Sequence, residues 1–171
     1  MFKQGKFLML AMLLLCAYPV ASKDCYVAPD FDEPIQSIKG EWKSVSHFYG
    51  DIILLVFNNQ SCDPSKECIT KLEGIYTANY KRRFKIMSVW SGSGSTRQGV
   101  INFFVNNKKK VSYDVFADPD DIAHDAYEVK GTYPRSFLID RDGCIAGSWY
   151  GCADANLLTI KNAVKAELDK D

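Results

Sequence analysis

The feature that most constrains the fold is an apolar run at residues 51–57, which is followed closely by a cysteine. A continuous apolar run of this length is typical of a central strand that is buried on both faces of a sheet. Pro64 then suits the first turn of a helix, where the missing N–H of proline costs nothing. A strand therefore delivers Cys62 to the start of a helix, where partial positive charge favours the reactive thiolate.

The segment that begins at Cys62 lacks the second cysteine of the common redox spacing, Cys-x-x-Cys. It reads Cys62-Asp-Pro-Ser65, so a serine stands at the fourth position. A serine alcohol cannot complete a thiol–disulfide exchange, because exchange proceeds by attack of a thiolate on a disulfide sulfur. The functional question is therefore whether Cys62 is used at all, and whether another thiol serves as its partner.

The rest of the chain predicts alternating strands and helices. Residues 23–47 form a lead-in with short strands, and the helix that starts near Pro64 continues to about Tyr80. We expect a strand at residues 84–90, a helix around 100–105, a strand at 111–116 and a short helix at 119–127. Residues 135–140 and 144–150 flank an Asp-Gly turn and predict a hairpin, and residues 153–168 predict a closing amphipathic helix. The order indicates an α/β fold with a central mixed β-sheet flanked by helices.

The first 22 residues have the pattern of a secretory signal peptide. Lys3 and Lys6 precede an apolar block at residues 7–20, and the small residues Ala21 and Ser22 follow it. The block is shorter than the roughly 20 apolar residues that span a bilayer. We therefore expect cleavage after Ser22 and a secreted domain of residues 23–171, extracellular or periplasmic, with no membrane insertion.

Charge and histidine content argue against several classes of partner. The chain balances 21 basic against 21 acidic residues, so nothing in it favours nucleic acid. The two histidines, His47 and His124, lack the spacing of a zinc site. We expect no metal and no cofactor.

Removal of the leader leaves five of the six cysteines, an odd number, so at least one thiol is free or paired outside the chain. Cys62 and Cys68 would lie about 9 Å apart along one helix. A disulfide tolerates roughly 7 Å between Cα atoms, so this pair would require the first turn to unwind. Cys144 and Cys152 cannot bridge each other, because an extended strand of that length spans about 26 Å. Cys25 is expected to tether the N-terminal segment to one of these two.

Several motifs in the right order resemble one family. They are Ala28-Pro-Asp-Phe31, the strand-to-helix segment 57–67, the Asp-Pro-Asp-Asp segment 117–121, and the run 131–143 that contains Tyr133-Pro134. Together they resemble the redoxins of the thioredoxin fold, the exported thioredoxin-like and AhpC/TSA-related family. The resemblance covers about residues 28–168, nearly the whole expected mature chain.

The resemblance implies a thioredoxin-like fold and a role for each matched residue. Cys62 is the expected nucleophile, acting on protein thiols or disulfides, and Pro134 matches the cis-proline that lies beside it, with Tyr133 on the substrate side. Cys152 follows the last strand where the family has a loop facing the active site, so it is the first candidate for a resolving thiol. Cys68 is the second candidate. The resulting function is thiol–disulfide exchange or isomerisation.

Two alternatives stay open. The first is a secreted binding or matrix protein without catalysis. Two departures from the family favour it: Ser61 stands where the family usually has Trp, and Ser65 stands where it has the second cysteine. Asn59-Gln-Ser61 is an N-glycosylation acceptor in a eukaryotic source, and a glycan there would shield Cys62. A peroxiredoxin-type peroxidase is less favoured. Those enzymes need Thr or Ser at the place that Asn59 occupies here, and Arg at the place that Pro134 occupies.

Overall fold

A computed structural model describes residues 25–170 and contains one seven-stranded sheet in the order β2-β1-β5-β4-β3-β6-β7. The expected signal peptide lies outside the described residues. The elements are β1 (Ile35–Ser37), β2 (Trp42–Lys43), β3 (Ile52–Asn58), α1 (Asp63–Asn79), β4 (Phe84–Ser91), α2 (Arg97–Asn106), β5 (Asp114–Asp118), α3 (Ile122–Ala126), β6 (Arg135–Ile139), β7 (Ile145–Tyr150) and α4 (Asp154–Leu168), with 3₁₀ turns η1 (Val45–Phe48) and η2 (Tyr80–Arg82).

Strand β3 lies inside the sheet, as its apolar run predicts. All seven of its residues are buried. It pairs in parallel with β4 and antiparallel with β6, so both of its edges are hydrogen-bonded. Parallel pairing also joins β4 to β5, and the carboxyl ends of these three strands therefore lie at one edge of the sheet.

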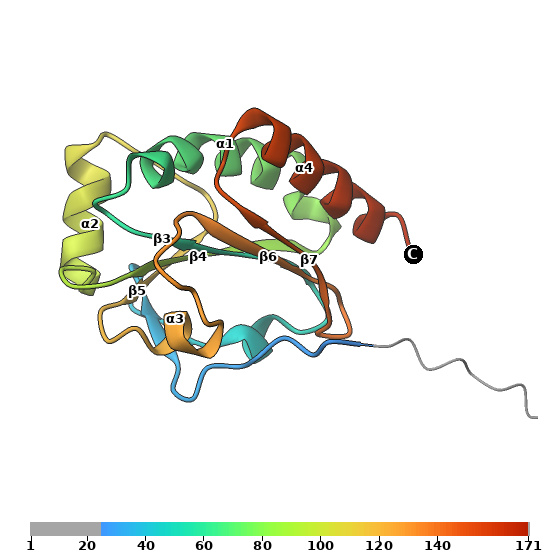
Figure 1. Ribbon diagram of the computed structural model, residues 1–171, viewed down its shortest axis with the longest axis horizontal. Helices are drawn as coiled ribbons and strands as arrows, with labels where there is room; N and C mark the ends of the chain where they lie inside the picture. Colours follow the sequence, from blue (N-terminus) through green and yellow to red (C-terminus); the bar gives the residue numbers. More distant parts are fainter. Residues whose placement is uncertain (1–24, 171) are drawn as a thin grey trace, which may run out of the picture.

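Each face of the sheet is covered by a separate hydrophobic cluster. On one face, Leu54 and Val56 pack with residues of α1, α2 and α4. On the other face, Ile53 and Leu55 pack with α3 and with the N-terminal lead-in. Figure 1 shows this layering, with α1, α2 and α4 on one side of the sheet and α3 on the other. The alternation of β3 side chains between two apolar layers explains why residues 52–57 are all apolar.

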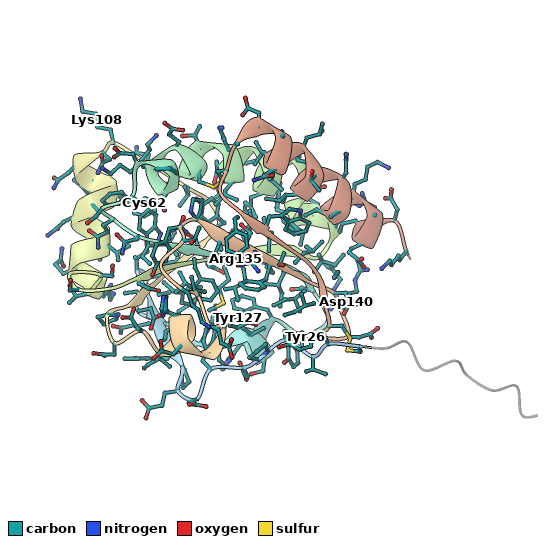
Figure 2. All side chains as sticks on the ribbon, viewed as in Figure 1. Tyr26, Cys62, Lys108, Tyr127, Arg135 and Asp140 are labelled. Atoms are coloured by element: carbon teal, nitrogen blue, oxygen red, sulfur yellow. A yellow bond between two sulfur atoms is a disulfide. The ribbon has the colours of Figure 1, made fainter. Side chains whose placement is uncertain are left out.

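The N-terminal segment is fastened to the hairpin at the far end of the sheet from Cys62 (Figure 2). Cys25 and Cys144 form a disulfide with a Cα–Cα distance of 5.5 Å. Backbone bonds from Ala28 N–H to Gly143 O and from Ile145 N–H to Tyr26 O continue the contact. Of the two partners expected for Cys25, the structure has Cys144.

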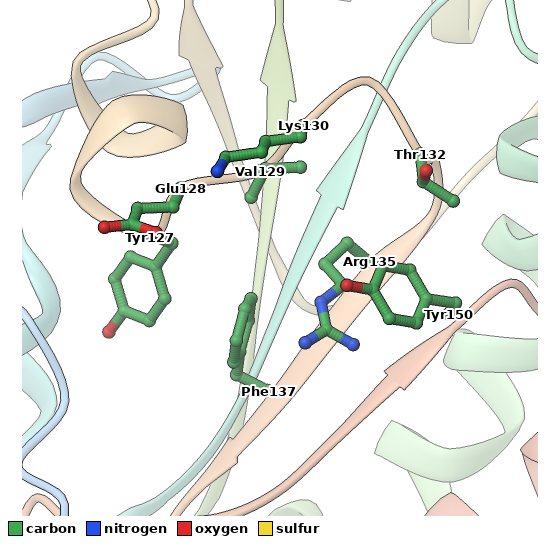
Figure 3. A pocket seen from close by; sticks show the side chains of 8 residues that line it. All are labelled: Tyr127, Glu128, Val129, Lys130, Thr132, Arg135, Phe137 and Tyr150. Atoms are coloured by element: carbon green, nitrogen blue, oxygen red, sulfur yellow. The ribbon is translucent and has the colours of Figure 1, made fainter.

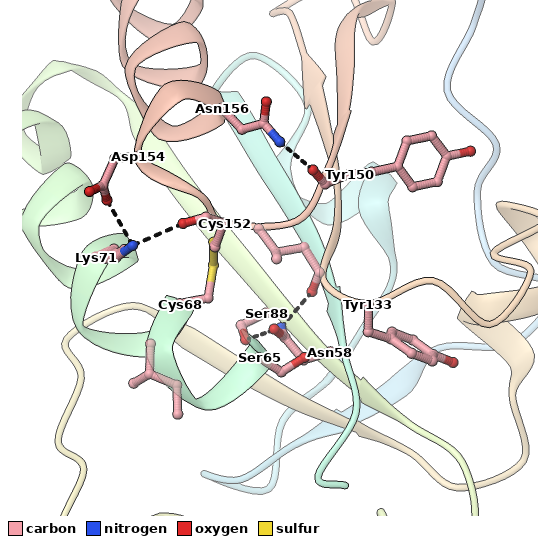
Figure 4. Close-up of a disulfide and its surroundings, with 12 residues drawn as sticks. Asn58, Ser65, Cys68, Lys71, Ser88, Tyr133, Tyr150, Cys152, Asp154 and Asn156 are labelled. Carbon is pink, nitrogen blue, oxygen red and sulfur yellow. Dashed lines mark hydrogen bonds and ion pairs between the residues drawn. A yellow bond between two sulfur atoms is a disulfide. The ribbon is translucent and has the colours of Figure 1, made fainter. Parts of the chain in front are cut away.

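The second disulfide joins Cys68 in α1 to Cys152 in the loop before α4, with a Cα–Cα distance of 5.6 Å. Both cysteines are buried and belong to the cluster formed by α1, α2 and α4. Lys71 donates to the backbone oxygen of Cys152 and pairs with Asp154, which adds polar contacts around the bridge (Figure 4). The bridge therefore links the helix that carries Cys62 at its start to the closing helix.

The predicted α/β order is confirmed, and the predicted helices and strands agree with the structure to within a few residues. The lead-in holds the short strands β1 and β2, which extend the sheet beside β5. Within residues 25–170, no helix combines the length and the apolar content that crossing a bilayer requires.

The Cys68–Cys152 bridge closes a loop of 84 residues, so its removal should enlarge the conformational freedom of the unfolded chain. We predict that the double substitution Cys68→Ala and Cys152→Ala lowers the free energy of unfolding by about 2–5 kcal/mol, measured by urea denaturation. Wild-type protein carried through the same purification is the control. A double variant as stable as the wild type would show that the bridge does not hold α1 against α4.

Candidate thiol site at the start of α1

Cys62 is the residue at which the loop after β3 becomes helix α1. It is the N-cap of α1 and has extended backbone angles, with Pro64 in the first turn. The backbone oxygen of Cys62 accepts from the N–H of Ser65 at 3.0 Å, which closes that turn. The 17-residue helix thus begins at Cys62 with the end that carries partial positive charge.

The thiol of Cys62 lies against the loop that leads into β6. Its Sγ is 3.4 Å from the backbone oxygen of Tyr133, and its side chain is partly exposed. The Tyr133–Pro134 peptide bond is cis, as the resemblance implies. Strand pairing brings the two segments together, since Phe57 of β3 is opposite Arg135 of β6. The roles of Tyr133 and Pro134 in substrate binding stay predictions.

Ser65, in the place of a second redox cysteine, has a structural contact. Its side chain is fully buried, and its Oγ accepts a hydrogen bond from the N–H of Asn59 at 3.3 Å. The bond ties the loop after β3 to the first turn of α1. The Ser65 hydroxyl therefore helps to hold in place the loop that carries Cys62.

Cys152, the first candidate for a thiol that resolves Cys62, is not bonded to Cys62 in the structure. Cys62 is free, and Cys152 is bonded to Cys68. The reason is the orientation of α1: Cys68, Leu72 and Ile75 share the buried face that packs toward Cys152, whereas Cys62 stands at the helix end. Cys68, the second candidate for resolution, is occupied by the same bridge. Neither cysteine offers a free thiol to Cys62.

A buried carboxylate lies at the same edge of the sheet and was not singled out from the sequence. Asp118 ends β5 and accepts from Ser91 Oγ at 3.0 Å and from the N–H groups of Ala123 and His124. Burial raises the pKa of Asp118 above its usual 3.8, while these hydrogen bonds act in the opposite direction. The sequence could have indicated this carboxylate, because polar residues that follow parallel strands gather at the carboxyl edge of the sheet.

Tyr133 connects this carboxylate region to the thiol. Its ring lies 6.1 Å from that of His124, measured between centroids. Burial, and then the negative charges of Asp121, Asp118 and Cys62, raise the pKa of the Tyr133 hydroxyl. That hydroxyl therefore stays protonated at neutral pH.

A cavity of about 440 Å³ opens on the other side of the cis-proline loop. Thr132 and Arg135, which flank the Tyr133–Pro134 bond, both line it. Figure 3 shows the Arg135 guanidinium between the rings of Tyr150 and Phe137. The guanidinium carbon lies 3.7 Å from the centre of the Tyr150 ring and 4.6 Å from that of Phe137.

The glycosylation acceptor Asn59 uses its side chain within the fold. Its Nδ2, the atom that would carry a glycan, donates to the backbone oxygen of Ser91 at 3.2 Å. Its Oδ1 accepts from the N–H of Ser61 at 2.9 Å. A glycan would have to displace the first of these bonds, and modification of Asn59 stays a prediction.

The histidines have local partners. His47 Nδ1 accepts from the N–H of Ser44 at 3.1 Å, and His124 Nδ1 lies 3.1 Å from Asp125. The part of the chain that the structure describes holds no group of three or more His, Cys, Asp or Glu side chains arranged for a metal ion.

Comparisons with solved structures agree with this fold. A structure assigned as the thiol:disulfide interchange protein DsbE from Chlorobium tepidum matches with a TM-score of 0.75 and 23% identity, over 85% of this chain and 98% of that one. A thioredoxin-family thiol:disulfide interchange protein from Chlorobium tepidum TLS matches with a TM-score of 0.68 and 20% identity, over 86% and 99%.

A third match is a secreted disulfide oxidoreductase of Mycobacterium tuberculosis, homologous to E. coli DsbE. Its TM-score is 0.64 and its identity 14%, over 78% of this chain and 94% of that one. At these identities the likeness establishes the thioredoxin-like fold alone. A comparison with curated protein sequences gave no match.

The family to which the chain belongs is shown by a match to a family sequence model and not by the structural likeness. The model of the AhpC/TSA family matches residues 26–148, which include β3, the Cys62 segment, the cis-proline and most of the hairpin. The chain therefore belongs to the AhpC/TSA family and has the thioredoxin-like fold.

Proposed function

We propose that the protein is an exported thiol–disulfide exchange protein that works through one cysteine, Cys62. The observation that carries the proposal is the state of this thiol: it is free, partly exposed, at the N-terminus of a long helix and 3.4 Å from the backbone oxygen of Tyr133. These are the conditions under which a cysteine is reactive and can be reached by a partner.

The first step is attack of the Cys62 thiolate on one sulfur of a partner's disulfide. A bond forms between Cys62 and that sulfur, the partner's S–S bond breaks, and the departing thiolate takes a proton from water. The product is a mixed disulfide between the two proteins. Tyr133 and Pro134 border the sulfur and would contact the partner's chain on either side of its cysteine.

Release of the partner needs a thiol from outside the chain. Ser65 carries an alcohol, and Cys68 and Cys152 are bonded to each other, so no thiol of the described residues resolves the mixed disulfide. A second thiol of the partner would release it with a rearranged disulfide, which is isomerisation. A small external thiol that attacks the Cys62 sulfur would release the partner with both of its thiols reduced and leave Cys62 in a disulfide with the small thiol. A second small thiol would then attack that disulfide, free Cys62 and leave as the oxidised pair of small thiols.

The two disulfides support an exported protein, because such bonds persist in oxidising compartments and are rare in the cytosol. They agree with the signal peptide expected from the sequence. The partners that this chemistry takes are exported proteins with exposed disulfides.

Removal of the sulfur should remove the activity while leaving the fold intact. We predict that Cys62→Ser lowers the rate of exchange with a disulfide-bonded protein substrate to the uncatalysed level. The free energy of unfolding should change by about 0.5 kcal/mol or less, since Cys62 is partly exposed. Exchange that survives this substitution would remove Cys62 from the mechanism. A Cys62 that resists alkylation in the wild type would favour a non-catalytic binding protein.

Restoring the missing thiol should change the lifetime of the mixed disulfide. We predict that Ser65→Cys, a change of similar volume, shortens that lifetime at least tenfold in the absence of added thiol, because the new sulfur attacks the mixed disulfide internally. The measurement is mass spectrometry of the complex at timed acid quenches, and Ser65→Ala is the matched control. Equal lifetimes in all three proteins would mean that release does not depend on position 65.

A further inference from the structure

The cavity beside the cis-proline loop has an unbalanced set of charges. Lys130 and Arg135 supply two positive charges to its lining, and Glu128 supplies one negative charge. In the part of the chain that the structure describes, neither cation has an ion-pair partner. Two cations and one carboxylate on one concave surface leave an excess of positive charge, which favours an anionic ligand.

Arg135 is held in position before any ligand arrives. It stands opposite Tyr150 in the β6–β7 pairing, and its guanidinium lies over that ring and against Phe137. One of its nitrogens donates to Ser148 Oγ at 3.1 Å. A guanidinium has five N–H donors, so others remain for a carboxylate, and the stacking reduces the side-chain entropy lost on binding.

The cavity is close enough to Cys62 to be filled by the molecule that Cys62 attacks. The thiol touches the backbone oxygen of Tyr133, and Arg135 lies two residues further along the chain. Two residues of chain span at most about 7 Å, and the cis Tyr133–Pro134 bond shortens this span. An extended partner chain whose cysteine meets Cys62 would therefore bring a side chain two or three residues away to the cavity.

We propose that this cavity selects partner proteins with an acidic side chain two or three residues from the cysteine that Cys62 attacks. Arg135, between the rings of Tyr150 and Phe137, binds the carboxylate through its fork of N–H donors (Figure 3), and Lys130 adds a second positive charge to the lining. Glu128 opposes the same carboxylate and limits the strength of the contact. The assignment rests on the proposed function, because it names the partner of that same thiol.

The test uses four peptides in two pairs, and the two members of a pair differ only by Glu or Gln. In one pair this residue stands two positions before a single cysteine, and in the other pair two positions after it. Each cysteine is carried as a mixed disulfide with 2-thiopyridine. Attack by the Cys62 thiolate forms the Cys62–peptide bond, breaks the peptide–pyridyl bond and releases pyridine-2-thione, which absorbs light. The readout is the ratio of the Glu rate to the Gln rate on one protein, so a change in the intrinsic reactivity of Cys62 cancels.

For the wild type at low salt we expect a ratio of roughly two to five in at least one peptide pair, the size of a partly exposed ion pair. The ratio should fall to about one in Arg135→Gln, fall less in Arg135→Lys, and approach one at high salt. Glu128→Gln should raise it, a change of opposite sign that a damaged fold would not produce. Lys161→Gln, which removes an exposed lysine on α4, is the control and should keep the wild-type ratio.

The outcomes separate this assignment from the proposed function. A ratio near one for the wild type in both pairs, or an unchanged ratio in Arg135→Gln and Glu128→Gln, would overturn the acidic preference. The neutral reagent 2,2′-dipyridyl disulfide tests the thiol alone. If wild-type Cys62 reacts with it while the peptides show no preference, only this assignment fails. If Cys62 does not react with it, the proposed function fails as well.

Discussion

The pairing of β3 with β6 is the interaction on which the site depends. Strand β3 carries the chain to Cys62, and β6 begins directly after the cis-proline. Antiparallel register sets Phe57 opposite Arg135, so the loop after one strand and the loop before the other meet at the same edge. A slip of one residue would turn the side chains of β3 to the opposite faces and separate the thiol from Tyr133. The burial of β3 on both faces makes that slip costly.

The cysteines divide into two structural pairs and one thiol that faces the outside. One bridge fastens the N-terminal segment to the hairpin, and the other fastens α1 to the loop before α4. The second bridge begins six residues after Cys62 on the same helix. It therefore stabilises the helix that begins at Cys62, while leaving Cys62 without a resolving partner. The chemistry that fits this division is exchange completed by an outside thiol.

The sequence predicts the fold well and the site only in part. The apolar run of β3, Pro64 after Cys62 and the Asp-Gly turn are local signals, and each led to the correct element. The sequence left the partner of Cys152 open, because that partner depends on which face of α1 carries Cys68. The spacing of Cys68, Leu72 and Ile75 along one apolar stripe was the available signal, since cysteine on such a stripe is buried with it. The stacking of Arg135 on Tyr150 had no local signal, because it arises from the register of two strands.

Among the cysteines of residues 25–170, Cys62 is the free thiol and the other four form two disulfides. Alkylation of the unreduced protein, followed by proteolysis and mass spectrometry, checks this division. We expect one alkyl group, on Cys62, with the peptide of Cys25 linked to that of Cys144 and the peptide of Cys68 linked to that of Cys152. A disulfide that contains Cys62, or an alkyl group on Cys68 or Cys152 in place of Cys62, would contradict it.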